Sequence, residues 1–186
     1  MMDKMTLFSQ ALSTLGDREY VRNSPTGNAC DLWFPDVMHE ALLFGAWSFA
    51  TRRETLQPLR PGVYRMPSDS LRLLSVDALR YELVGDEIHV ESSWGRVGED
   101  GLDVKYISNR LAKTEELPEN QPLFCRGVML LLAARVSPKV TTKMDIAMAL
   151  EAQAKDVLSE ALYRDAQMRD SNDQHPLADI LNSSII

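Results

Sequence analysis

The chain has 186 residues, 45% hydrophobic and 25% charged, a composition typical of a soluble globular protein with one domain, or one domain carrying an insertion. Its 20 basic and 27 acidic side chains give a net charge of -7 without a basic cluster, which disfavours a protein that grips nucleic acid. No apolar run reaches the length of a membrane span, and we expect no signal peptide.

The first predicted element is a short amphipathic helix over about residues 4–15. Its hydrophobic residues recur at helical spacing, the pattern of a helix with one buried face: Leu7, Phe8, Ala11, Leu12 and Leu15. Asp3 can cap the first turn, and Gly16 can end the helix. Residues 17–27 then carry asparagine, serine, proline and glycine, so we expect a loop there.

A second helix is expected at least from Pro35 to Trp47. Its start has two solutions. Either Pro35 is the first helical residue, or the helix begins near Asn28 and kinks at the proline. After this helix we expect a connector that runs through Pro58 and Pro61, because prolines interrupt regular structure.

Residues 63–109 change to a period of two. Apolar and polar side chains alternate in four short runs, which predicts half-buried strands: Leu71–Leu73, Tyr81–Leu83, Ile88–Val90 and Leu102–Tyr106. Gly85-Asp86 lies between two of these runs and predicts a tight hairpin. We therefore expect a small antiparallel meander with one packed and one wet face, and a projecting loop at Gly95–Gly101.

A helix pair is predicted next. Residues 121–136 are apolar on almost every side, which indicates a helix buried on most sides. Ser137-Pro138 is expected to break it, and Thr141 or Thr142 can cap a long helix that continues to about Asp170.

These elements predict an α+β fold, mainly α. Residues 1–62 and 111–170 would form one helical bundle, with a small antiparallel β-sheet inserted over 63–110. The remaining residues, 171–186, would form an extended C-terminal tail. This tail has a polar start and an apolar end, so it either folds back onto the core or docks into a partner.

No familiar catalytic or phosphate-binding motif occurs, and we expect no cofactor and no metal. His89 and Glu91 share one face of a predicted strand and could serve in acid–base chemistry, although a solvated sheet surface is the favoured reading. The two cysteines, Cys30 and Cys125, have no metal-ligand spacing and are expected to be buried thiols.

The three tryptophans are expected to differ. Trp47 follows an apolar stripe and should lie in the core, whereas Trp33 could lie in the core or at an interface. Trp94, next to the glycine-rich loop, either holds the hairpin or forms part of a binding surface.

Several short strings occur in an order shared with a known family: Ala11–Gly16, Trp47–Arg53, Pro67–Leu74, Tyr81–Gly85, Tyr106-Ile107 and Leu130–Ala133. They resemble the tail tubular protein A family of short-tailed bacteriophages, and related head–tail adaptors look similar. The likeness extends from about residue 7 to residue 170, with Ser70 standing where the family has a cysteine.

The resemblance implies a structural protein of the virion tail or neck, made in the host cytoplasm, and not an enzyme. It implies a ring of copies, expected to be a dodecamer, between the portal protein and the tail tube or nozzle, with DNA passing through the lumen. An acidic lumen would repel the DNA phosphates and avoid adhesion.

Two contacts follow from this hypothesis. The apolar end of the tail would bind the portal through five side chains: Leu177, Ile180, Leu181, Ile185 and Ile186. Trp94 and Arg96 would contact the tail side. Two alternatives remain open. One is a small hydrolase or transferase that uses His89 and a carboxylate, and the other is a monomeric or dimeric protein-binding module.

Overall fold

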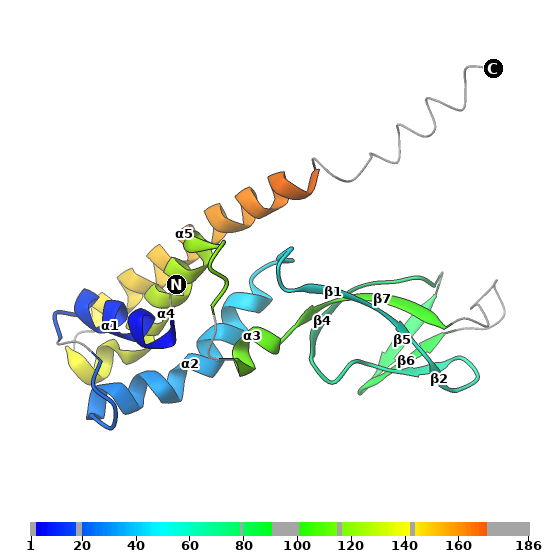
Figure 1. The fold of residues 1–186 in the computed structure, drawn as a ribbon, viewed down its shortest axis with the longest axis horizontal. Helices are drawn as coiled ribbons and strands as arrows, with labels where there is room; N and C mark the ends of the chain where they lie inside the picture. Colours follow the sequence, from blue (N-terminus) through cyan, green and yellow to red (C-terminus); the bar gives the residue numbers. More distant parts are fainter. Residues whose placement is uncertain are drawn as a thin grey trace, which may run out of the picture.

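The computed structural model describes residues 3–17, 20–78, 80–90, 101–114, 117–141 and 144–170. It confirms the predicted fold class, since the chain is α+β and mainly α. The helices gather at one end of the molecule and the strands at the other, and α5 extends along the helical end (Figure 1).

Helix α1 (Lys4–Thr14) agrees with its prediction. The Asp3 carboxylate accepts a hydrogen bond from the backbone N–H of Thr6 at 2.6 Å, which caps the first turn. Gly16 follows the helix with a φ of 78°, a left-handed conformation that favours glycine at helix ends. The predicted apolar face is buried from Leu7 to Leu12.

Helix α2 (Pro25–Leu43) starts earlier and ends earlier than predicted. The Ser24 hydroxyl caps it, with a proline at the first helical position, so the loop expected before it is shorter. Of the two predicted starts, Pro35 is wrong, because it lies inside the helix; the alternative start near Asn28 is three residues too late. Trp47 lies beyond its end, in the fully buried position that the sequence predicted.

Two further helices form the predicted pair, α4 (Pro122–Val140) and α5 (Met144–Asp170). The break expected at Ser137-Pro138 is wrong, because α4 continues through it. Pro138 stands in the last turn, where its missing N–H removes only one helical hydrogen bond. The short helix α3 (Arg110–Lys113), a single turn, was not predicted.

Helix α4 is the centre of the bundle. It packs against α5 along its length and also against α1 and α2, whereas α2 and α5 contact each other little. Gly127 allows the close approach of α5, since a Cβ there would lie 2.5 Å from Leu158 Cδ2. Both cysteines are free and buried in this bundle, as predicted.

The described strands form two antiparallel sheets. The first has the order β1-β7-β4 and consists of β1 (Thr51–Leu56), β4 (Ser70–Val76) and β7 (Leu102–Ser108). The second has the order β2-β3-β6-β5 and consists of β2 (Pro58–Arg60), β3 (Val63–Arg65), β5 (Tyr81–Val84) and β6 (Glu87–Val90). The predicted hairpin at Gly85-Asp86 joins β5 to β6.

Two predictions for this region are wrong. The stretch through Pro58, expected as a connector, forms β1 and β2, so the strands begin at Thr51. Both are edge strands, where charged residues and proline are tolerated. Their sequences therefore lack the apolar alternation by which strands are predicted. The strands do not form one meander either, because β7 pairs with β1 and β4 and not with β6.

The two sheets enclose a second, smaller core. Its buried residues come from both sheets and include Tyr64, Ile88 and Val104. Strand β7 links this core to the bundle, because Tyr106 lies in the smaller core and its neighbour Ile107 lies in the bundle core. Two bulges in β4 accompany this junction, and their residues Leu71 and Leu74 pack against the bundle.

Candidate functional site

The predicted partner contacts fall outside the part of the chain that the structure describes. This applies to the tail-side residues Trp94 and Arg96, and to the five portal-binding side chains: Leu177, Ile180, Leu181, Ile185 and Ile186. Their roles therefore stay predictions. Trp33, for which core and interface were both open, is 38% exposed on α2.

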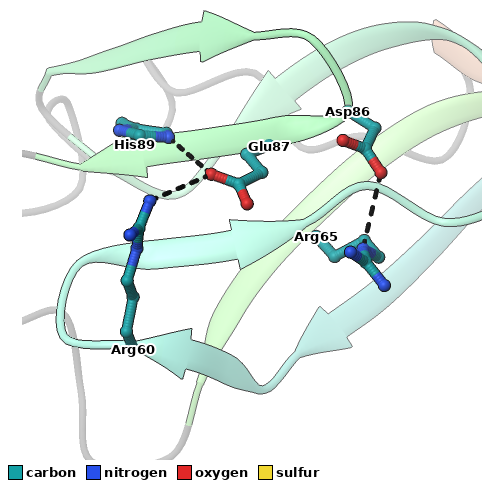
Figure 2. A network of polar contacts seen from close by, with 5 residues as sticks. All are labelled: Arg60, Arg65, Asp86, Glu87 and His89. Atoms are coloured by element: carbon teal, nitrogen blue, oxygen red, sulfur yellow. Dashed lines mark hydrogen bonds and ion pairs between the residues drawn. The ribbon is translucent and has the colours of Figure 1, made fainter.

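His89 belongs to a network of charged side chains on the outer face of the four-stranded sheet (Figure 2). Its Nε2 lies 2.9 Å from Glu87 Oε2, and the same oxygen lies 3.3 Å from an Arg60 nitrogen. Beside this group, Arg65 pairs with Asp86 at 3.4 Å. The hydrogen bond from His89 is the largest cause that lowers the pKa of Glu87.

Glu87 is the partner of His89 that sequence reasoning missed. The expected partner, Glu91, lies outside the described residues. Glu87 stands two residues before His89 on the same strand face, so the rule that suggested Glu91 applied equally to it. The His89 and Glu87 side chains are 34% and 27% exposed, which is typical of a solvated ion network.

A hollow of about 570 Å³ lies on the outer face of the three-stranded sheet. Arg53 and Lys105 occupy directly opposite positions on β1 and β7 along it. Across the same strands, the Thr55 hydroxyl donates to Asp103 Oδ1 at 2.5 Å. With Asp77 also in its lining, the hollow holds both signs of charge and favours no single ionic ligand.

A second hollow, of about 390 Å³, lies where α1 meets the start of α2. Lys4 Nζ is 3.1 Å from the Asp31 carboxylate and 5.3 Å from the centre of the Phe8 ring. The Tyr20 hydroxyl also donates to Asp31, at 2.8 Å. Burial and the contact with Asp31 raise the pKa of Tyr20. Lys4 thus occupies the place beside Asp31 and the Phe8 ring where a cationic ligand would bind. Its ion pair with Asp31 links α1 to α2.

Asp165 is the one acidic side chain that is buried among the described residues, at 2% exposure on α5. It accepts hydrogen bonds from the Ser48 backbone N–H, at 2.8 Å, and from the Ser48 hydroxyl. Ser48 follows Trp47 in one of the strings on which the family resemblance rests. Hydrogen bonds to the carboxylate compensate for its burial, so the contact holds α5 to the segment after α2.

A polar cluster lies between the bundle and the sheets. The Tyr106 hydroxyl is 3.1 Å from both Glu54 Oε2 and Asp69 Oδ1, and the Ser108 hydroxyl donates to Asp69 at 2.6 Å. Burial, followed by these carboxylates, raises the pKa of Tyr106. Burial raises the pKa of Asp69, but hydrogen bonds from Ser108 and Tyr106 outweigh it and lower that pKa. This cluster therefore holds the helical bundle and the two sheets together where they meet.

Among the described residues, no group of three His, Cys, Asp or Glu side chains could hold a metal ion. None of the described helices combines the length and the apolar character that crossing a bilayer requires.

The described surface of the bundle also carries exposed apolar side chains. On α2, Leu32 (71% exposed), Pro35 and Leu43 recur at helical spacing on the outward face. On α5, one outward side carries the exposed residues Met148, Ala152, Ser159, Tyr163 and Ala166, with the charged Lys155 among them. These two surfaces are called the α2 face and the α5 face below.

Neither a protein-family model nor a curated protein matches this chain significantly, so the candidate surfaces stand on their own geometry.

Proposed function

We propose that this protein is a structural ring subunit, an adaptor in the neck of a tailed bacteriophage that joins the portal to the tail. Its work is stoichiometric: each copy contacts its neighbours, the portal and the tail, and the assembled ring leaves a lumen through which DNA passes. The chain's net charge of -7 supports this role, because an acidic wall does not adhere to DNA phosphates.

The observation that carries the proposal is the pair of outward faces on the bundle. α4 lies between α2 and α5, so the α2 face and the α5 face point away from different sides of the same central helix. Two different exposed apolar surfaces support a heterologous contact, in which the α2 face of one copy binds the α5 face of the next copy. Repeated contacts of this kind close into a ring when the rotation permits.

The two faces also have a similar length. The α2 face presents the large side chains Leu32 and Leu43, and the α5 face presents the small residues Ala152 and Ser159 between Met148 and Tyr163, with Lys155 among them. Leu32 and Leu43 are eleven residues apart, as are Ala152 and Tyr163, which corresponds to about 16 Å along each helix. The two helical faces can therefore pack against each other over the same length.

Mass photometry and electron microscopy of the purified chain, alone and mixed with the portal of the same phage, test the ring. We expect closed rings whose mass is a multiple of 20.9 kDa. Leu32→Glu and Met148→Glu should each abolish ring closure, because each places a charge on one face. Gln153→Glu, on an exposed position of α5 beside the stripe, is the control and should assemble.

A mixture of the two defective variants sharpens this test. Leu32→Glu retains an intact α5 face and Met148→Glu retains an intact α2 face, so together they should form one heterodimer that grows no further. A chain that stays monomeric both alone and with the portal contradicts the proposal. Rings that form from both variants would show that these faces are not the contact.

The predicted end contacts have their own tests. Truncation after Asp173 should abolish portal binding and leave the helical circular dichroism unchanged. Trp94→Ala should weaken attachment of the tail without loss of folding. Full portal affinity of the truncated chain would show that its C-terminal residues do not bind the portal. Unchanged attachment of the phage tail would show that Trp94 does not contact it.

Loss of a catalytic turnover in a folded His89→Ala variant would instead support the hydrolase alternative.

A further inference from the structure

The four edge strands of the two sheets differ in how they are protected. An edge strand presents unpaired backbone groups, and proteins usually block it with charge, proline or bulges. β1 carries Arg52, Arg53 and Glu54, all exposed, and β4 is interrupted by two bulges. The edges of the three-stranded sheet are therefore blocked in the usual ways.

The four-stranded sheet differs because its edges also expose apolar side chains, although β2 has a proline, an arginine and a register shift of its own. The exposed large hydrophobic residues of the described strands all lie on its two outermost strands: Leu59 on β2, and Tyr81, Leu83 and Val84 on β5. Tyr81 and Leu83 stand in register with Val90 and Ile88, which are buried on the neighbouring strand. They are half-exposed because the described sheet has no strand beyond β5.

Strand direction makes these two edges compatible with each other. All neighbours in the order β2-β3-β6-β5 are antiparallel, so β2 and β5 run in opposite directions. A second copy rotated about an axis along the strands keeps its strand directions, and its β2 then continues the antiparallel pattern beside β5. An isologous pairing of β5 with itself would leave Leu59 on β2 uncovered.

Charge favours one register for this pairing. Glu82 on β5 and Arg60 on β2 lie on the same outer face, because both are connected through His89 and Val63 in the sheet register. The Glu82 side chain has no hydrogen bond or ion pair in the described structure. The Arg60 side chain is 64% exposed and pairs with Glu87 at 3.3 Å, so Glu82 would be its second carboxylate partner. Placing the neighbour's Arg60 opposite Glu82 pairs these charges and brings Leu59 beside Leu83.

We infer that β5 of one copy binds β2 of the next copy, so that the four-stranded sheets join into one continuous antiparallel sheet around the assembly. This inference rests on the proposed ring, and it adds a second contact between neighbours beyond the helical faces. The occupant of the β5 edge is thus another copy of this chain, recognised by backbone pairing, by Leu59 and by Arg60.

Thiol cross-linking of the full chain tests the pairing. The double variant Leu59→Cys/Leu83→Cys places one thiol on each edge, and the native thiols do not compete because Cys30 and Cys125 are 0% and 1% exposed. Treated with a short bismaleimide, alone and on the portal, the double variant should give a ladder of dimers, trimers and larger products. Each single variant should give no ladder, because a heterologous contact needs both edges.

The outcomes separate this inference from the proposed function. Closed rings by mass photometry without a cross-linked ladder would overturn the continuous sheet and leave the ring intact. Dimers from Leu83→Cys alone would show β5 pairing with itself, which also overturns the inference. A chain that never assembles, alone or on the portal, would overturn both.

A charge exchange tests the register independently of the cysteines. Glu82→Arg should reduce ring formation, because it faces the neighbour's Arg60, and the added change Arg60→Glu should restore it. The control is Arg65→Glu, on the same outer face but on the inner strand β3, which should not rescue Glu82→Arg. Rescue by the control, or no loss in Glu82→Arg, would contradict the Arg60–Glu82 register.

Discussion

The helical bundle and the part formed by the two sheets, called the β-part below, bury their apolar side chains to different extents. In the bundle, the central α4 is covered on several sides, and large side chains such as Trp47 and Phe124 are completely buried. The β-part encloses a much smaller core, and one of its sheets ends in exposed apolar strands. Most of the buried core residues therefore lie in the bundle, whereas the sheets leave apolar side chains at their edge.

The largest expected effect comes from emptying the bundle core. Trp47 packs edge-to-face on Phe124, at 5.0 Å between ring centres, and its Nε1 donates to the Ala41 carbonyl at 2.8 Å. Trp47→Ala should lower the free energy of unfolding by about 3–5 kcal/mol. Urea denaturation followed by circular dichroism measures it. Trp33→Ala, on the surface of α2, is the matched control, and an equal loss in both variants would contradict this assignment of the core.

The next largest effect should be confined to the β-part. Ile88 is fully buried between the two sheets, so Ile88→Ala should cost about 2–5 kcal/mol of local stability. We expect hydrogen exchange to accelerate in β3, β5 and β6 while α4 stays protected, because the two cores are separate clusters. Val84→Ala, on the exposed edge, should change little. Equal acceleration in α4 would mean that the two parts unfold together.

The same comparison explains what could be predicted from the sequence. Helices depend on local periodicity and caps, so α1, α4 and α5 were found with small errors at their ends. Sheet pairing depends on contacts distant in sequence, and alternation around Leu102–Tyr106 indicates a strand without indicating that β1 and β4 are its partners. Arg52-Arg53 and Pro58 also lack any apolar alternation, so β1 and β2 were missed.

Candidate contacts divide in the same way. The rule of side chains two apart correctly placed His89 on a solvated strand face but pointed forward to Glu91, while the described partner is Glu87. The apolar stripe predicted as core on α2, which includes Val37, Met38 and Leu42, is buried, whereas the exposed Leu32 and Leu43 lie outside it and were not singled out, because periodicity does not state whether a second apolar face is covered by a neighbour. Exposure of that kind follows only from the packed structure.

A smaller effect tests the joint between α5 and the segment after α2. Ser48→Ala removes the hydroxyl that donates to the buried Asp165 carboxylate, while the backbone N–H donor remains. A hydrogen bond to a charged group contributes about 1.5–3 kcal/mol, so the free energy of unfolding should fall by that amount. Ser159→Ala, which removes an exposed hydroxyl on the same helix, is the control for thermal denaturation. An equal effect in both would argue against a structural role of Asp165.

The smallest effect concerns the exposed charged network around Glu87 and His89, and it is best measured at the Glu87 carboxyl carbon. The pKa of Glu87 lies below its ordinary value, first because of the hydrogen bond from His89 and then because of the charge of Arg60. A depressed pKa means that the network's contribution to stability is present above the unfolded-state pKa and is lost as pH falls through the folded-state pKa. Carboxyl-carbon NMR titration should therefore show the Glu87 pKa rising towards its ordinary value in His89→Ala, and rising less in Arg65→Ala. An unchanged Glu87 pKa in His89→Ala would mean that this contact does not persist in solution.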